Sequence, residues 1–273
     1  MAFGTRWTRN RNGKVKIMAE TNASVPLLQI RDLSVRFNTD SGIVHAVNGL
    51  NLSLHRGKAL GFVGETGAGK TTTALAVLQL IQTPPGEIAG GEILFDGEDI
   101  MKMTEAERRE IRGNRIAMIF QDPMTSLNPI MTVEEQIMEM IALHSEAKGE
   151  DARKRAHEML ALVGIRPERA KDYPHQFSGG MRQRAMIAMT LLCQPKLLIA
   201  DEPTTALDVT IQAQILELMK DLKQVINSSI ILITHDLGII SDLCDEVIVM
   251  YAGRVAERGS IDDIFYRTAH PYT

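Results

Sequence analysis

One stretch constrains the fold more than any other: residues 64–71 read Gly-Glu-Thr-Gly-Ala-Gly-Lys-Thr, which matches the phosphate-binding pattern G-x-x-x-x-G-K-[ST]. The preceding residues 58–63 form a short apolar segment that is typical of a buried strand. Residues 71–81 carry Leu75, Leu78 and Ile81 at helical spacing. Because this motif requires a strand before it and a helix after it, the sequence predicts a phosphate-binding loop in an α/β fold.

The residue types of this loop suit a nucleotide phosphate. Glycines let backbone N–H groups converge on phosphate oxygens, and the following helix adds the positive end of its dipole. Lys70 is expected to reach the β- and γ-phosphates, the Thr71 hydroxyl to ligate Mg²⁺, and Thr72 to lie beside the same phosphates. The predicted nucleotide-binding residues here are Gly64, Glu65, Thr66, Gly67, Ala68, Gly69, Lys70, Thr71 and Thr72.

Charge is distributed unevenly along the 273 residues. The chain has a formal net charge of −4, but residues 1–17 hold five basic and no acidic side chains, which leaves −9 for the rest. An acidic body argues against nucleic-acid binding, and no apolar run reaches the roughly 18 residues of a membrane span. We expect residues 1–25 to be a flexible basic arm, residues 1–17 to have no catalytic role, and residues 26–273 to form the functional domain.

The segments around the loop show clear periodicities. Residues 26–37 and 44–54 alternate around a turn, which predicts a small antiparallel sheet. Residues 131–162 are helical in pattern with a break at 145–151, which predicts a helical subdomain, at about 123–190, inserted into the α/β core. Further helices are expected at 104–112, 181–193 and 208–225, and strands at 91–97, 247–250 and 253–257.

Polar residues follow several buried strands where each strand ends. Gln121 follows the apolar run 115–120, Asp201 and Glu202 follow 196–200, and His235 follows 229–234. Ligands bind at the carboxyl ends of the strands in open α/β sheets, so these side chains are candidates for one site.

Other candidates are weaker when taken alone. Ser178-Gly179-Gly180 opens a helix and is a second potential anion site, although it is also a common helix entry. Phe37 ends a strand, where its face could stack on an adenine, but the strand pattern alone favours an ordinary core residue. Cys193 and Cys244 form no metal-binding pattern and are expected to be reduced, buried thiols.

Taken together, these motifs resemble the ATP-binding subunits of ABC transporters. The resemblance covers residues 27–273 and implies a P-loop NTPase (RecA-like) core with an N-terminal antiparallel β subdomain and an inserted α-helical subdomain. The matching motifs are Gly64–Thr71 as Walker A, Gln121 as the Q-loop, Ser178–Gly180 as the signature, Leu197–Glu202 as Walker B, Thr205–Asp208 as the D-loop and His235 as the switch histidine.

A narrower resemblance is to the dipeptide/oligopeptide and nickel importer ATPases, carried by residues 120–129, 201–214 and the final His-Pro-Tyr-Thr. Such proteins commonly continue into a tail that can hold an iron–sulfur cluster, but because this sequence ends at Thr273 no cluster is predicted. The signature departs from the commoner Leu-Ser-Gly-Gly-Gln by reading Phe177-Ser-Gly-Gly-Met181. The phosphate-facing Ser178 and Gly180 are intact, so anion binding is still expected.

The resemblance implies roles for individual residues. ATP is held between two ATPase subunits, with the Walker A loop of one facing the signature of the other. Asp201, Thr71 and Gln121 are assigned to Mg²⁺, and Glu202 to activation of the attacking water. Gln121 and His235 are assigned to sensing the γ-phosphate, Lys70 to catalysis, Asp208 to the subunit interface and Phe37 to adenine stacking.

The partners implied are a second ATPase subunit (more often a paralogue than a copy), two transmembrane permease subunits and, indirectly, an extracytoplasmic solute-binding protein. The chain is then expected on the cytoplasmic face of the membrane as a peripheral subunit that energises import of di- or oligopeptides. Two alternatives stay open: a soluble ABC ATPase of DNA repair or translation, and a non-hydrolysing nucleotide-binding module. Intact Glu202 and His235 favour hydrolysis, which a phosphate-release assay checks.

Overall fold

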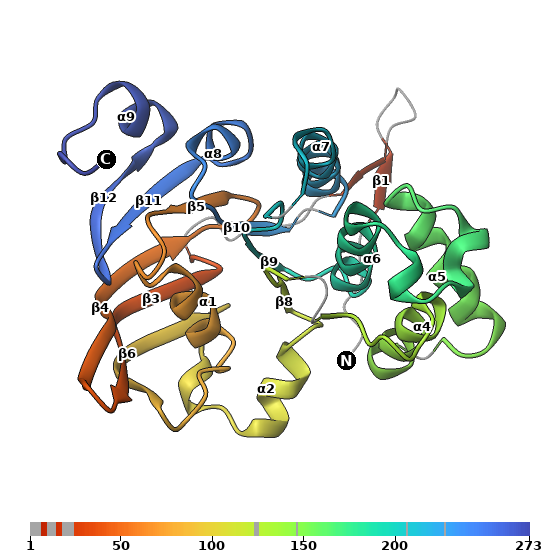
Figure 1. Cartoon of the computed structure of the whole chain (residues 1–273), viewed down its shortest axis with the longest axis horizontal. Coiled ribbons are helices and arrows are strands. Elements are labelled where there is room, and N and C mark those ends of the chain that lie inside the picture. Colours follow the sequence, from red (N-terminus) through yellow and green to blue (C-terminus); the bar gives the residue numbers. More distant parts are fainter. Residues whose placement is uncertain are drawn as a thin grey trace.

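The computed structural model (Figure 1) describes residues 25–122, 126–145, 147–205, 207–221 and 228–273, and the backbone alone of residues 7–9, 15–17 and 222–226. Strands β1 (Trp7–Arg9) and β2 (Val15–Ile17) pair as an antiparallel ladder, which the sequence pattern did not indicate. The rest of the predicted arm up to residue 24 lies outside the described residues.

A six-stranded sheet forms the centre of the described fold. Its strands are β5 (Ala59–Val63), β8 (Ile116–Ile119), β9 (Leu197–Asp201), β10 (Ser229–Ile233), β11 (Glu246–Tyr251) and β12 (Arg254–Ser260). The order is β12-β11-β5-β10-β9-β8, and only β12 pairs antiparallel to its neighbour. β5, β8, β9 and β10 are buried along their whole length, because both faces of this part of the sheet are covered, and this explains their continuous apolar runs.

An antiparallel sheet packs against one face of this sheet. Its strands are β3 (Leu28–Thr39), β4 (Gly42–Leu54), β6 (Gly86–Phe95) and β7 (Glu98–Asp99), in the order β4-β3-β6-β7. A shared core contains Leu28 and Ile93 of this sheet, Leu60 and Phe62 of β5, and Val77 of helix α1 (Lys70–Val77). The predicted N-terminal antiparallel sheet is therefore confirmed.

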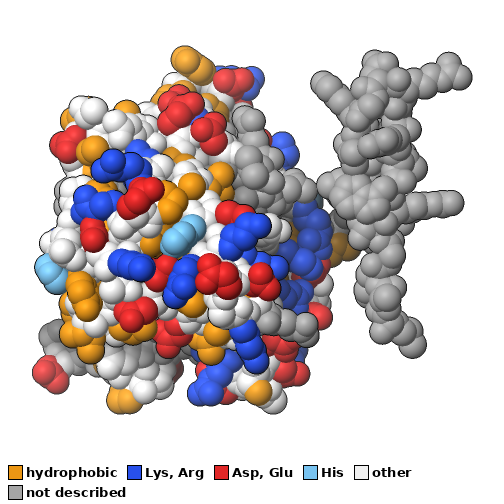
Figure 2. Space-filling view, turned by 90° about the vertical axis from the view of Figure 1, so that its right-hand side faces the viewer, with side chains coloured by type: hydrophobic (Ala, Val, Ile, Leu, Met, Phe, Trp, Pro, Cys, Tyr) orange, Lys and Arg blue, Asp and Glu red, His pale blue; other side chains and the backbone are white. Residues whose placement is uncertain are grey.

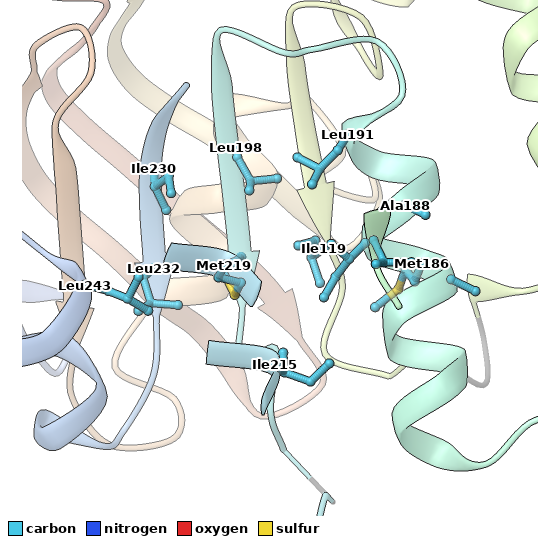
Figure 3. Packing of buried hydrophobic residues seen from close by; sticks show 14 of the residues in the cluster. Ile119, Met186, Ala188, Leu191, Leu198, Ile215, Met219, Ile230, Leu232 and Leu243 are labelled. Atoms are coloured by element: carbon cyan, nitrogen blue, oxygen red, sulfur yellow. The ribbon is translucent and has the colours of Figure 1, made fainter. Parts of the chain in front are cut away.

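Helices α6 (Gly179–Leu191), α7 (Val209–Ile226) and α8 (Leu237–Leu243) cover the other face of the six-stranded sheet (Figure 1). Figure 3 shows Leu198 and Leu232 of the sheet pointing toward Leu191, Met219 and other side chains of these helices. Side chains that alternate along β9 fall into the two cores in turn, as the pleat of a strand requires.

Helices α4 (Val133–His144) and α5 (Glu150–Leu162) lie between β8 and β9 in the sequence and pack with α6 at one end of the molecule (Figure 1). A capping box of Thr132 and Glu135 starts α4, and the buried Ile137 and Leu160 join these helices to the core. Figure 2 shows that acidic and basic side chains lie intermixed on this side of the molecule.

Several element boundaries differ from the predictions. α1 ends at Val77 rather than Ile81, because Gln79 turns into the left-handed region (φ 53°) and the N–H of Leu80 bonds back to the Leu75 carbonyl. β6 begins at Gly86, not Gly91. At Gly91 a Cβ would lie 2.6 Å from the Leu33 Cα, so this glycine permits the close approach of β3 instead of starting a strand.

Two helices and the degree of cysteine burial were also missed. α8 and α9 (Ile261–Tyr266) are capped by Asp236 and Ser260, whose side chains accept from the N–H groups of Gly238 and Asp263. α2 (Glu105–Ile111) is confirmed, with Thr104 as its cap.

Cys193 and Cys244 are free but only half-buried. Among the described helices none has the length and hydropathy needed to cross a bilayer.

Candidate functional site

The phosphate-binding loop connects β5 to α1, and its backbone needs glycine at two positions. Gly64 and Gly69 have positive φ angles of 151° and 98°. A Cβ would lie 2.2 Å from the Met250 carbonyl oxygen at Gly64 and 2.3 Å from the Ala46 carbonyl oxygen at Gly69. The tip, Glu65–Gly67, is exposed, so this side of the loop is open to an approaching anion.

Lys70 is the buried cation of this loop, with only 6% of its surface exposed. Its Nζ donates to the carbonyl oxygens of Gly64 at 2.6 Å and Glu65 at 2.9 Å. Burial lowers the Lys70 pKa, and the negative charges of Glu202 and Asp201 oppose this shift. The side chain is therefore a desolvated donor set into the loop, suited to a phosphate oxygen.

Asp201 ends β9 directly beside α1. Its Oδ1 accepts a hydrogen bond from the Thr71 hydroxyl at 3.1 Å, and 2% of the residue is exposed. Burial raises the Asp201 pKa, while the Thr71 hydrogen bond and Lys70 oppose this shift. A hydroxyl and a carboxylate are ligands that Mg²⁺ prefers, so this pair fits such an ion.

Glu202 is the centre of a polar cluster at the ends of β8, β9 and β10. Its Oε2 accepts from Gln121 Nε2 at 3.2 Å and from the Thr205 hydroxyl at 2.9 Å, and its Oε1 lies 3.5 Å from His235 Nδ1. Its φ of 46° is a costly conformation for a non-glycine residue, and its N–H bonds to the Ile233 carbonyl. The backbone therefore turns at this point and presents the carboxylate to its three polar neighbours.

The structure thus brings together Lys70, Asp201, Glu202, Gln121 and His235, which the sequence had placed at the ends of separate strands. Sequence reasoning missed Thr205 as a partner of Glu202. The available signal was a hydroxyl three residues after a carboxylate at a strand end, where such local hydrogen bonds are common.

Ser178–Gly180 forms a separate surface. The Ser178 hydroxyl accepts from the Met181 N–H at 3.4 Å and caps α6, while a Cβ on Gly180 would lie 2.5 Å from Ile211 of α7. Asp208 caps α7 by accepting from the Ile211 N–H at 2.9 Å. In the part of the chain that the structure describes, no hydrogen bond joins Ser178–Gly180 to the phosphate-binding loop.

Phe37 is half-buried near the end of β3, opposite Gly86. Its ring edge and the side chain of Ile81 both lie 2.7 Å from where a Cβ on Gly86 would stand. This contact explains why position 86 is glycine. Adenine stacking by Phe37 stays a prediction, as do contacts of Thr66 and Thr72 with phosphate.

Comparison with known proteins gives independent evidence about the family to which this chain belongs. The sequence matches the family described as ABC transporter over residues 47–205. It is 56% identical to the oligopeptide transport ATP-binding protein OppD of Bacillus subtilis (strain 168), over 90% of this chain and 70% of the relative. It is 51% identical to the dipeptide transport ATP-binding protein DppD of the same strain, over 90% and 74% respectively.

Two solved structures are similar to the fold. One is the dimeric post-hydrolysis structure of the ATP-binding cassette MJ0796 bound to ADP and Pi, with a TM-score of 0.77 and 27% identity over 86% of this chain and 98% of that chain. The other is cbiO1 from Clostridium perfringens, part of the ABC transporter complex cbiONQ, with a TM-score of 0.73 and 30% identity over 88% and 90%.

Proposed function

Since the chain belongs to the ABC transporter family, we propose that it is the ATP-hydrolysing subunit of a peptide importer. It is an ATPase of this family, and relatives more than half identical to it are named as oligopeptide or dipeptide transport ATP-binding proteins. The observation that carries the catalytic assignment is the Glu202 carboxylate, held by Gln121 and Thr205 at the strand ends that also carry Asp201 and His235.

ATP binding is assigned to the residues of the phosphate-binding loop. The N–H groups of Thr66–Thr71 and the dipole of α1 attract the phosphates, and Lys70, which donates two of its three N–H groups to the Gly64 and Glu65 carbonyls, directs the third to the β- and γ-phosphate oxygens. Thr71, Asp201 and Gln121 hold Mg²⁺. When bound, that ion neutralises phosphate charge. Phe37 stacks on the adenine and fixes the base end of the nucleotide.

Hydrolysis is assigned to Glu202 as the base that takes a proton from the attacking water. Without nucleotide, Thr205 and Gln121 both donate to one of its carboxylate oxygens, and His235 lies near the other. Gln121 and His235 are therefore placed to respond when a γ-phosphate enters, because each can exchange Glu202 for a phosphate oxygen. Thr205 keeps the carboxylate oriented while this exchange takes place.

The transferring γ-phosphate needs hydrogen-bond donors on the side that the phosphate-binding loop leaves open. We assign these donors to Ser178, Gly179 and Gly180 of a second ATPase subunit, at the N-terminus of its thirteen-residue helix α6. The second subunit is a paralogue or another copy of this chain, and the exposed Asp208 lies in the interface between them.

A groove between the sheet and the helical block is suited to a membrane partner. It has a volume of about 540 Å³ and is lined mainly by apolar side chains, among them Leu78, Leu80, Phe120, Leu127, Met140 and Met186. The groove adjoins the loop after Gln121, so a helix seated in it is coupled to the site. We assign it to an amphipathic cytoplasmic helix of a permease subunit, whose apolar face such grooves accommodate. Two permease subunits then hold the chain at the cytoplasmic face, and the solute-binding protein acts through them.

Substitution of Leu80 by Asp tests this docking surface. Leu80 lines the groove and is 41% exposed, so a carboxylate there is tolerated by the fold but desolvated by an apolar helix. We expect Leu80→Asp to lose at least about 10-fold in affinity for the permease subunits while ATP binding stays unchanged. Co-purification with the permease subunits measures this loss of affinity.

Leu162→Asp is the matched control, since Leu162 is 46% exposed and lies at the end of α5, outside the groove. Equal retention of both variants would contradict the assignment.

The solute is tested with the native assembly. The chain is co-purified with its membrane subunits and solute-binding protein in lipid vesicles, and ATP hydrolysis is measured with di- and oligopeptides or with nickel ions. Peptide-stimulated hydrolysis and vesicle uptake of the peptide are expected. Stimulation by nickel alone would assign the chain to metal import instead.

A further inference from the structure

The phosphate-binding loop has a partner that lies more than two hundred residues away in the sequence. The Glu65 N–H donates to the Tyr272 hydroxyl oxygen at 3.1 Å. In the same peptide unit the Gly64 carbonyl accepts from Lys70 Nζ at 2.6 Å. Tyr272 and Lys70 therefore hold the two opposite sides of the Gly64–Glu65 peptide, whose planarity makes its carbonyl and N–H turn together.

Two features of this peptide make such a restraint important. Gly64 has no Cβ, so rotation of the peptide that follows it meets little steric resistance. The Gly64 carbonyl is also one of the two acceptors that fix Lys70 within the loop. We propose that Tyr272 is a positioning residue for ATP binding: by accepting the Glu65 N–H it fixes this peptide and, through the Gly64 carbonyl, the Lys70 ammonium. The inference rests on the proposed ATP site.

The segment that presents Tyr272 is anchored independently of the loop. The Glu257 carboxylate on β12 accepts the N–H groups of Ala269 at 2.7 Å and His270 at 3.1 Å. The Tyr272 N–H donates to His270 Nδ1 at 3.1 Å, which closes a tight turn. These hydrogen bonds set the position of Tyr272 relative to the sheet.

The ring of Tyr272 leans on the strand that supports the loop. It packs against Tyr251 with centroids 4.6 Å apart and an interplanar angle of 50°, and Tyr251 is the last residue of β11. The preceding Met250 carbonyl occupies the space where a Gly64 Cβ would stand. The end of β11 therefore supports both Gly64, which belongs to this peptide, and Tyr272, which holds the peptide in place.

The test uses Tyr272→Phe, which removes the hydroxyl and keeps the ring. Tyr266→Phe is the matched control, because Tyr266 lies on α9, is 82% exposed and makes no hydrogen bond through its hydroxyl among the described residues. The Kd for a fluorescent ATP analogue with Mg²⁺ is measured, together with KM and kcat. A net hydrogen bond corresponds to about a 3- to 10-fold weaker Kd and higher KM in Tyr272→Phe, with kcat within about twofold.

Amide exchange supplies a readout apart from activity. Peptides that cover the loop are expected to exchange faster in Tyr272→Phe than in the unaltered chain or in Tyr266→Phe, while the melting temperature of Tyr272→Phe falls by no more than about 4 °C, the shift that one hydrogen bond explains. Unchanged Kd and exchange in Tyr272→Phe would overturn the inference and leave the ATP site standing, as would equal effects in both variants. Failure of the unaltered chain to bind ATP would overturn the site itself.

Discussion

Glu202→Gln is expected to slow ATP hydrolysis by about 100- to 10,000-fold, the usual contribution of a positioned general base, while ATP still binds. The amide cannot take a proton from water. It retains an oxygen that accepts from Thr205, so the local geometry is preserved. Removal of the charge also weakens the contact with His235, which leaves that residue free for the γ-phosphate.

The same substitution is expected to accumulate an ATP-bound dimer. If hydrolysis separates the subunits, blocking it keeps the γ-phosphate between Lys70 of one chain and Ser178 of the other. Single-turnover kinetics measure the chemical step, and light scattering during size exclusion measures the mass with and without ATP. Glu217→Gln on the exposed face of α7 is the matched control. Normal turnover in Glu202→Gln would remove Glu202 from the role of base.

Lys70→Ala is expected to weaken ATP binding by about 10- to 100-fold, the cost of losing a charged hydrogen bond to a phosphate in a partly buried site. The effect differs in kind from that of Glu202→Gln, because binding is lost before chemistry begins. Lys70 has already lost much of its hydration in the loop, so its interaction with phosphate is screened less than that of a surface lysine.

Equilibrium titration with a fluorescent nucleotide measures this loss, and thermal unfolding without nucleotide shows whether the loop remains folded. Lys102→Ala is the control, since Lys102 is exposed and pairs only with Asp99 in the described structure. Unchanged affinity in Lys70→Ala at an unchanged melting temperature would contradict the assignment of residues 64–71 to phosphate.

The sequence predicted those parts of the fold that local patterns determine. Continuous apolar runs identified β5, β9 and β10, because both faces of that sheet are buried, and the glycine motif fixed the junction of β5 and α1. The predicted end of α1 at Ile81 was wrong, because Leu78 and Ile81 continue the apolar spacing although Gln79 has already left the helix. Side chains pack on the core after a helix ends as well as within it.

Contacts between distant segments could not be predicted in this way. The strand ends suggested that Gln121, Glu202 and His235 meet, since parallel strands deliver their carboxyl ends to one edge. No local rule pairs Tyr272 with Glu65, because that contact depends on β12, α9 and a turn held by Glu257. The short α8 and α9 were missed since seven and six residues carry too little periodicity.

The central claim is that one ATP is held by two chains, and mixing two inactive variants tests it most directly. Ser178→Glu places a negative charge where phosphate is expected yet keeps a favourable charge at the start of α6. Lys70→Ala disables the loop of the other variant. If the sites are shared, an equal mixture forms mixed dimers with one intact site, and about a quarter of the unaltered ATPase rate should return. A mixture no more active than the two variants assayed separately, under conditions in which Glu202→Gln dimerises with ATP, would show that each chain completes its own site.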